Sequence, residues 1–93
     1  MAFDPWIEKG REMHRQAERV PSVTILKAAL WLERKYEATP AFRTAAIISL
    51  HYLVLALRKH AMRRAMMFDY YMVQALRWRR QAMHCFNDHT ANV

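Results

Sequence analysis

The amino-acid sequence predicts an all-α protein, a small bundle of three to four helices in a single domain that spans residues 1–93. Three observations predict this fold class. The chain contains one glycine and three prolines, so little in it interrupts a helix. Apolar residues recur at spacings of three and four, which places them on one face of a helix. Hydrophobic residues make up 54% of the chain, above the roughly 45–50% of typical globular domains, so a packed core is expected.

The first helix is expected over residues 4–20. Asp4 precedes Pro5, and an acidic N-cap followed by proline is a typical helix start. The one glycine, Gly10, falls on the apolar stripe of this helix, where it costs about 1 kcal/mol relative to alanine. We therefore expect another backbone to approach closely there. The stripe consists of Phe3, Trp6, Gly10, Met13, Ala17 and Val20.

The second helix is expected over residues 22–37, after Pro21. Its apolar residues form two faces about 100° apart, which predicts a helix packed between two neighbours. Glu33 lies between these faces and is expected either at the rim of the core or partly buried against an arginine. The first face consists of Ile25, Ala29, Leu32 and Tyr36, and the second of Val23, Leu26 and Leu30.

The next helical stretch, residues 41–86, contains neither glycine nor proline. As one helix it would be about 69 Å long, whereas a domain of this size has a radius of gyration near 13 Å. The stretch therefore either folds back or belongs to an elongated oligomer. Its most apolar segment, residues 44–57, is shorter than the roughly 20 residues that span a bilayer. We expect a buried core helix there and no transmembrane segment.

Asp69 is the expected break in this stretch. As an N-cap it would place Phe68 and Val73 in a hydrophobic staple. Inside a helix its carboxylate would lie on the predicted core face and would need an arginine partner. That face consists of Met62, Ala65, Met66, Met72, Val73, Leu76 and Met83. The expected elements are helices over 40–67 and 69–86, followed by a frayed tail over 87–93.

The chain has a net charge of +7, and its positive charge is concentrated in the second half. Residues 1–40 hold seven basic and six acidic residues, and residues 41–93 hold eight basic and two acidic residues. This asymmetry indicates an anionic partner, such as nucleic acid, an acidic protein face or a membrane surface. The alternative is a solvated face that maintains solubility.

The candidate binding residues lie in the basic region 58–80. Arginine binds phosphate or carboxylate through two parallel hydrogen bonds, and aromatic side chains stack on bases. The candidates wrap around more than one side of a helix, so an alternative is that several pair with acids of the first two helices. The candidates are Arg58, Lys59, Arg63, Arg64, Tyr70, Tyr71, Arg77, Trp78, Arg79 and Arg80. Those expected to be most exposed are Lys59, Arg63, Arg77 and Trp78.

Methionines are frequent in the same region. Thioethers suit adaptable binding surfaces, but these residues follow the helical stripe, so we expect them mainly to fill the core. They are Met62, Met66, Met67, Met72 and Met83.

Cys85 is the one cysteine of the chain, so no intramolecular disulfide can form. Residues 1–6 lack the pattern of a signal peptide, and a cytoplasmic protein is therefore expected. Cys85 and His89, close to His84 and Asp88, have a spacing that can bind zinc. A structural zinc site needs four ligands, however, so we expect no metal and no cofactor.

The sequence predicts a binding protein rather than an enzyme, because it contains no glycine-rich phosphate loop, nucleophile elbow or zinc-hydrolase motif. The first hypothesis is a non-enzymatic regulator that binds a protein partner stoichiometrically through arginine, methionine and aromatic residues. It would be an adaptor or inhibitor, for example of nucleic-acid-handling machinery. The second hypothesis is direct nucleic-acid binding through residues 58–80, and the third is binding to a membrane surface. The excess of apolar residues also predicts a homo-oligomer.

Overall fold

Four helices form the structure, a computed structural model that describes residues 4–91, the side chains of residues 88–91 excepted. The helices are α1 (Pro5–Gln16), α2 (Ser22–Ala38), α3 (Phe42–Ala61) and α4 (Ala65–Ala91). They pack as a bundle with a radius of gyration of 13.6 Å, so the predicted all-α fold is confirmed. Within the described residues, no helix is both long and apolar enough to cross a membrane.

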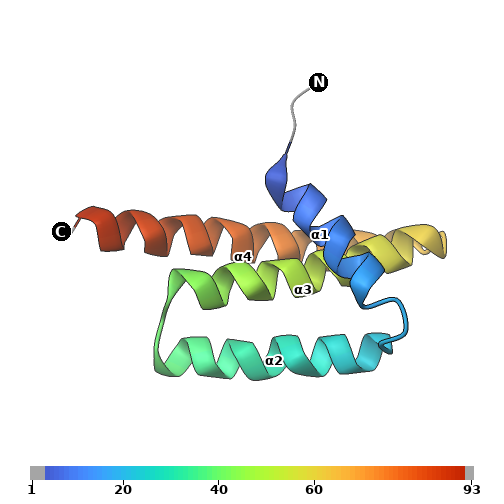
Figure 1. Ribbon diagram of the computed structural model, residues 1–93, viewed down its shortest axis with the longest axis horizontal. Helices are drawn as coiled ribbons and strands as arrows, with labels where there is room; N and C mark the ends of the chain where they lie inside the picture. Colours follow the sequence, from blue (N-terminus) through green and yellow to red (C-terminus); the bar gives the residue numbers. More distant parts are fainter. Residues whose placement is uncertain (1–3, 92–93) are drawn as a thin grey trace.

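The third helix lies at the centre of the bundle. Figure 1 shows α2 and α4 running alongside α3 in the opposite direction, while α1 crosses it at an angle. Across the described residues, the backbones of α1, α2 and α4 each lie beside α3 and not beside one another. The core therefore forms around α3 on several sides.

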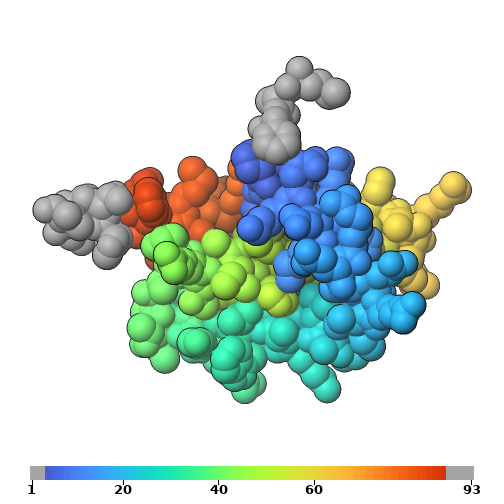
Figure 2. All heavy atoms as spheres, in the orientation of Figure 1, coloured from blue at the N-terminus to red at the C-terminus, as the bar shows by residue number. Residues whose placement is uncertain are grey.

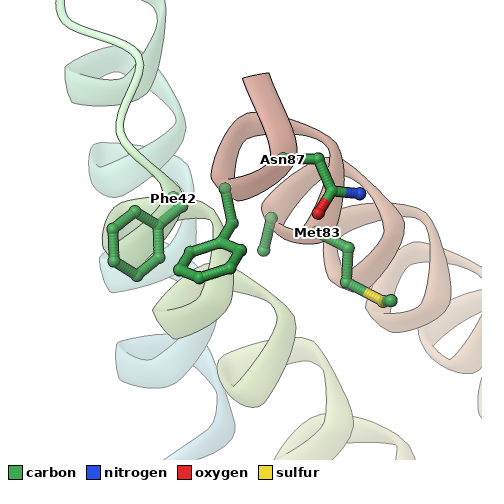
Figure 3. A pocket seen from close by; sticks show the side chains of 5 residues that line it. Phe42, Met83 and Asn87 are labelled. Carbon is green, nitrogen blue, oxygen red and sulfur yellow. The ribbon is translucent and has the colours of Figure 1, made fainter. Parts of the chain in front are cut away.

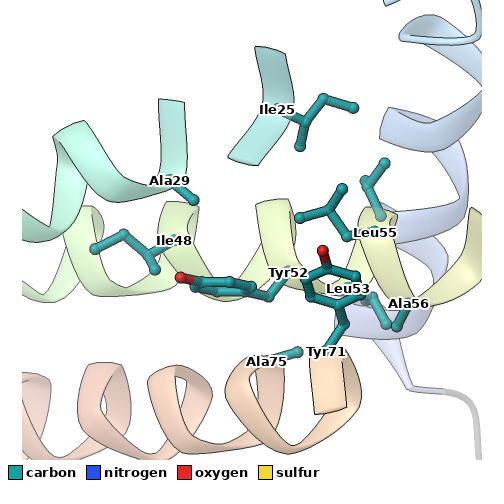
Figure 4. Close-up of a cluster of buried hydrophobic side chains, with 10 residues drawn as sticks. Ile25, Ala29, Ile48, Tyr52, Leu53, Leu55, Ala56, Tyr71 and Ala75 are labelled. Atoms are coloured by element: carbon teal, nitrogen blue, oxygen red, sulfur yellow. The ribbon is translucent and has the colours of Figure 1, made fainter. Parts of the chain in front are cut away.

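Five consecutive residues of α3, residues 52–56, are buried. Consecutive residues of a helix point about 100° apart, so burial of all five requires neighbours around most of its circumference. Figure 4 shows these neighbours: Ile25 and Ala29 approach from α2, and Tyr71 and Ala75 approach from α4. The expectation of a buried core helix in this segment is confirmed.

The start of α1 agrees with the sequence prediction. Asp4 Oδ1 accepts a hydrogen bond from the Trp6 backbone N–H at 3.0 Å, and Pro5 is the first helical residue. Gly10 packs on Leu53 of α3, since a Cβ built at Gly10 would lie 2.8 Å from Leu53 Cγ. The expected close approach is confirmed, but the neighbour is a side chain and not a backbone.

The first helix ends at Gln16 and not at Val20, the expected end. Arg58 of α3 donates to the Ala17 and Val20 carbonyls at 2.5 and 2.6 Å, and to Ser22 Oγ at 3.1 Å. A side chain from another helix thus satisfies acceptors that follow the last turn. Val20 is exposed in this turn. The stripe residues Trp6, Met13 and Ala17 pack against the core as expected, and Phe3 lies outside the described residues.

Only one of the two apolar faces predicted for α2 is covered by the described residues. Ile25 and Ala29 of the first face are buried, whereas Val23 and Leu30 of the second face are exposed and only Leu26 of that face packs against the core. The prediction of a helix between two neighbours is therefore wrong. The reason is that α2 lies at the side of the bundle, where α3 alone among the described helices runs beside its backbone.

The long stretch breaks at residues 62–64 and not at Asp69. Arg63 adopts a left-handed backbone conformation there, with φ 57°. Asp69 lies inside α4 and is exposed, so it is neither an N-cap nor a carboxylate in the core. Helix α4 continues to Ala91, so the frayed tail expected from residue 87 is wrong up to that point. Residues 92 and 93 lie outside the described part of the chain.

Candidate binding surfaces

The turn between α3 and α4 is held by main-chain hydrogen bonds at the end of α3. The Arg63 N–H donates to the His60 carbonyl at 3.0 Å, and the Arg64 N–H donates to the Lys59 carbonyl at 2.9 Å. This pair of bonds is a Schellman motif, in which the residue after the helix cap is left-handed and is usually glycine. Arg63 occupies that position, where a residue with a Cβ costs roughly 1 kcal/mol more than glycine.

Basic and apolar side chains surround this turn, which projects at one end of the molecule in yellow in Figure 2. Arg63 and Arg64 are exposed, and neither forms an ion pair within the described residues. The His60 and Phe68 rings lie 5.3 Å apart, beside a depression of about 260 Å³. We call this group the turn cluster: Lys59, His60, Met62, Arg63, Arg64 and Phe68.

Two of the predicted binding arginines bind inside the fold. Arg58 bonds the chain between α1 and α2, as described above. Arg79 forms an ion pair with Asp4, with Nη1–Oδ2 and Nη2–Oδ1 distances of 3.0 and 3.3 Å. Its guanidinium also lies 4.7 Å from the centre of the Trp6 ring. Arg58 therefore links α3 to the N-terminal part of the chain, and Arg79 links α4 to it.

The Asp4 carboxylate is stabilised in its charged form. Desolvation raises the pKa of Asp4, but the Trp6 backbone N–H and the Arg79 guanidinium outweigh that effect and hold the pKa below its ordinary value of 3.8. A carboxylate that is both an N-cap and an ion-pair partner favours the folded state while it remains ionised.

Two of the predicted stacking residues belong to the core. Tyr71 is buried and stacks on Tyr52, with ring centres 6.4 Å apart. Trp78 is half-buried and packs edge-on against Tyr36, so the expectation that it is among the most exposed candidates is wrong. The reason is that both residues lie on the side of α4 that faces α3.

Glu33 is held by these aromatic residues and not by an arginine. Its Oε1 accepts hydrogen bonds from Tyr52 Oη at 3.2 Å and from Trp78 Nε1 at 3.1 Å. Burial, followed by the negative charge of Glu33, raises the pKa of Tyr52. The hydroxyl is thus kept as a neutral donor to the carboxylate, and the contact joins α2, α3 and α4.

The outer face of α4 is the surface of this helix that is turned away from α3. Its apolar members are strongly exposed: Met66 by 87%, Tyr70 by 60%, Val73 and Met83 by 58%, and Leu76 by 40%. Most of the residues that were predicted to form the core face of this helix therefore lie on its outer face, so that prediction is wrong. The outer face consists of Met66, Asp69, Tyr70, Val73, Leu76, Arg77, Arg80 and Met83.

The expectation that the methionines fill the core is wrong for four of the five. Met72 packs against the core. The others are exposed, because they lie in the turn before α4, in the first turn of α4 or on its outer face. These four are Met62, Met66, Met67 and Met83.

The opposite end of the bundle carries a shallow apolar depression, shown in Figure 3. Phe42 at the start of α3 meets Phe86 of α4 edge to face, with ring centres 5.3 Å apart. Ala82, Met83 and Asn87 complete the lining around a volume of about 380 Å³. The depression is open to solvent and holds no charged side chain among its described lining residues.

Cys85 lies beside this depression and bonds within the fold. Its Sγ is 2.8 Å from Tyr36 Oη, and burial followed by this hydrogen bond raises the pKa of Tyr36. In the part of the chain whose side chains are described, no three His, Cys, Asp or Glu residues come together. The side chains of Asp88 and His89 lie outside that part.

The structure divides the ten predicted site residues into two groups and one residue between them. The residues that contact the rest of the fold are Arg58, Tyr71, Trp78 and Arg79, and the exposed residues are Arg63, Arg64, Tyr70, Arg77 and Arg80. Lys59 is half-buried, so the expectation that it is among the most exposed candidates is wrong. The sequence analysis missed the second apolar stripe of α4. The signal was present, because one stripe of three-and-four spacing faces inward and another faces outward. The inner stripe is Phe68, Tyr71, Ala75, Trp78, Ala82 and Cys85.

Comparisons with protein-family models, with curated proteins and with solved structures give no match.

Proposed function

We propose that this protein is a non-enzymatic regulator, an adaptor or inhibitor, that binds an acidic surface of a protein partner through the turn cluster. The observation that supports this most is Arg63. A left-handed residue with a side chain costs stability, and such conformations are concentrated at functional sites. Glycine would fit the Schellman motif better, so an arginine at this position suggests that its side chain is used.

The composition of the turn cluster suits a protein partner. Arg63 and Arg64 present two guanidinium groups that form no ion pair within the described residues, and guanidinium binds carboxylate through paired hydrogen bonds. Exposed Met62 and the half-buried ring of Phe68 supply apolar contact beside them. Arginine, methionine and aromatic residues are enriched at protein interfaces, and a carboxylate-rich partner face would complement the charge.

Nucleic-acid binding is the alternative, and its support is narrower. Binding of single strands combines a basic groove with exposed stacking rings. Here Tyr71 and Trp78 pack in the core, and Arg58 and Arg79 are bonded within the fold. The basic region 58–80 therefore presents separate positive groups rather than a continuous strip.

The test uses two substitutions that keep the turn intact. The double variant Arg63→Gly/Arg64→Gln removes both guanidinium groups, and glycine at position 63 suits the left-handed backbone. Arg34→Gln, on the exposed side of α2, is the control. The tagged full chain is crosslinked in a lysate of its source cells, with and without nuclease, and the captured proteins are quantified.

We expect the double variant to capture its protein partner about tenfold less, as for loss of interface hot spots, while Arg34→Gln and nuclease change nothing. We also expect Arg63→Gly alone to raise the free energy of unfolding by about 1 kcal/mol, measured by urea denaturation. A binding loss in a more stable protein is not a folding defect. Unchanged capture by the double variant contradicts the proposal, and capture abolished by nuclease supports nucleic-acid binding instead.

A further inference from the structure

The outer face of α4 has the residue spacing of a coiled-coil seam. Met66, Asp69, Val73, Leu76, Arg80 and Met83 follow one another at alternating steps of three and four, which are the a and d positions of a heptad repeat. All six are exposed, and α3 alone among the described helices runs beside α4. An apolar seam about 25 Å long is thus left uncovered within one copy of the chain.

Two opposite charges interrupt this apolar seam. Asp69 is the only acidic residue between Glu37 and Asp88, and it lies on the outer face together with Arg80. Within the described residues neither has an ion-pair partner. One acid and one base placed symmetrically about an apolar centre can satisfy each other only across an interface, because along one helix they are 11 positions apart.

We propose that the outer face of α4 binds the same face of a second copy of this chain, with the two α4 helices antiparallel. In that orientation Asp69 meets the second copy's Arg80, and the two-fold axis repeats the pair. A parallel arrangement would instead place Asp69 against Asp69 and Arg80 against Arg80, and like charges in contact are strongly unfavourable. The charges therefore select the antiparallel orientation.

The same alignment matches the apolar residues. With Asp69 opposite the second copy's Arg80, Val73 lies opposite Leu76 and Met66 lies opposite Met83, as a and d layers do in an antiparallel pair. Sliding one helix by a heptad would bury Asp69 against Val73, or Arg80 against Leu76, and an unpaired charge in an apolar layer is costly. A single register therefore satisfies every layer.

The flanking positions fit this alignment as well. Tyr70 of one copy would lie beside Arg77 of the other, a pairing that allows a cation–π contact. Tyr70 is 60% exposed within one copy. Neither Tyr70 nor Arg77 belongs to the turn cluster. The proposed dimer therefore does not depend on the proposed function.

Charge reversal tests the pairing. In sedimentation equilibrium of the full chain, we expect Arg80→Asp and Asp69→Arg each to raise the dimer dissociation constant about tenfold or more, since two ion pairs are replaced by two repulsions. The double variant Asp69→Arg/Arg80→Asp restores the pair and should return the constant to within about threefold of the wild type. Arg34→Asp on α2 makes the same change of net charge as Arg80→Asp and should leave the dissociation constant unchanged.

Two outcomes would overturn the proposed dimer. A wild-type chain that is monomeric at about 100 μM, a range in which even weak association is visible, overturns the proposal. So does a double variant that stays dissociated. The variants of the turn cluster serve as a second control: they should keep the dimer, so that a failure here and a failure of the proposed partner binding can be told apart.

Crosslinking tests the orientation. In a chain with Cys85→Ser, one sample carries Met66→Cys and a second carries Met83→Cys. Antiparallel pairing predicts a disulfide between the two samples when they are mixed under mild oxidation, and little disulfide within either sample alone. Efficient disulfide formation within each sample would instead show a parallel pair and contradict the proposal.

Discussion

At the scale of single residues, the one glycine of the chain lies in the middle of a helix, and an arginine occupies a helix end where glycine is usual. Gly10 is buried against Leu53 because the crossing of α1 and α3 leaves no room for a Cβ. Arg63 keeps its Cβ in a left-handed turn. Each residue departs from its usual place for a local reason, steric at Gly10 and, in our proposal, functional at Arg63.

Substitution of Gly10 by alanine tests the steric reason. Alanine favours a helix over glycine by about 1 kcal/mol, but its methyl group would overlap the Leu53 side chain, and overpacking costs about 1–3 kcal/mol. We therefore expect Gly10→Ala to lower the free energy of unfolding by about 1–2 kcal/mol, measured by urea denaturation. In a Leu53→Ala background the same substitution should become neutral or stabilising. Equal destabilisation in both backgrounds would contradict the contact.

The sequence predicted the chemistry of the candidate site, but not which of its residues are exposed. The region rich in arginine and aromatic residues is evident from composition, and five of the ten candidates are exposed. Arg58 and Arg79 do not, because their partners are set by tertiary structure. The carbonyls of Ala17 and Val20 are acceptors only because α1 ends early, and Asp4 approaches Arg79 only after α1 crosses the bundle.

At the scale of helices, the start of α1 was more predictable than the break, whereas α3 begins at Phe42 and α4 at Ala65 rather than at the expected residues 40 and 69. Asp4 and Pro5 fix the start of α1 through a side-chain cap and a preset φ angle. The α3–α4 turn has no such residue. Its hydrogen bonds are main-chain bonds, which any sequence can form once Arg63 adopts a left-handed backbone conformation. The sequence therefore does not mark this turn, and the break was predicted at Asp69, which resembles an N-cap.

The contact between α1 and α4 gives a pH-dependent prediction. The pKa of Asp4 lies below 3.8 in the folded chain, so its stabilisation is fully present above that value and is lost as pH falls through the lowered folded pKa. Asp4→Asn keeps an N-cap acceptor but removes the charge that pairs with Arg79. We expect it to be less stable than the wild type at pH 7, with a difference that shrinks below about pH 4. Urea denaturation from pH 2 to 7 measures this, and a difference independent of pH would refute it.

At the scale of the whole molecule, the bundle is organised around α3. The apolar segment in that helix predicted its burial, because a helix that is apolar on all sides needs neighbours on all sides. The exposed stripes of α2 and α4 could not be predicted in the same way. A stripe of apolar residues has the same spacing whether it meets the same chain or a second one.

This organisation predicts a graded pattern of amide hydrogen exchange. Residues 52–56 are buried among the other helices, so their amides should exchange only through near-global unfolding. Amides of α1 should exchange at least about tenfold faster, since this helix can detach from α3 while α2 and α4 stay in place. Exchange measured residue by residue by NMR checks this, and uniform protection across all four helices would contradict it.

The main-chain bonds of the α3–α4 turn have a consequence for the thermodynamics of binding. A surface formed by a flexible loop must lose backbone entropy when a partner orders it. Here the Arg63 and Arg64 N–H groups donate to the His60 and Lys59 carbonyls, respectively, so the backbone of this turn is ordered without a partner. In the binding that we propose, only the ends of long side chains remain to be immobilised, so the entropic cost is smaller than for a flexible loop.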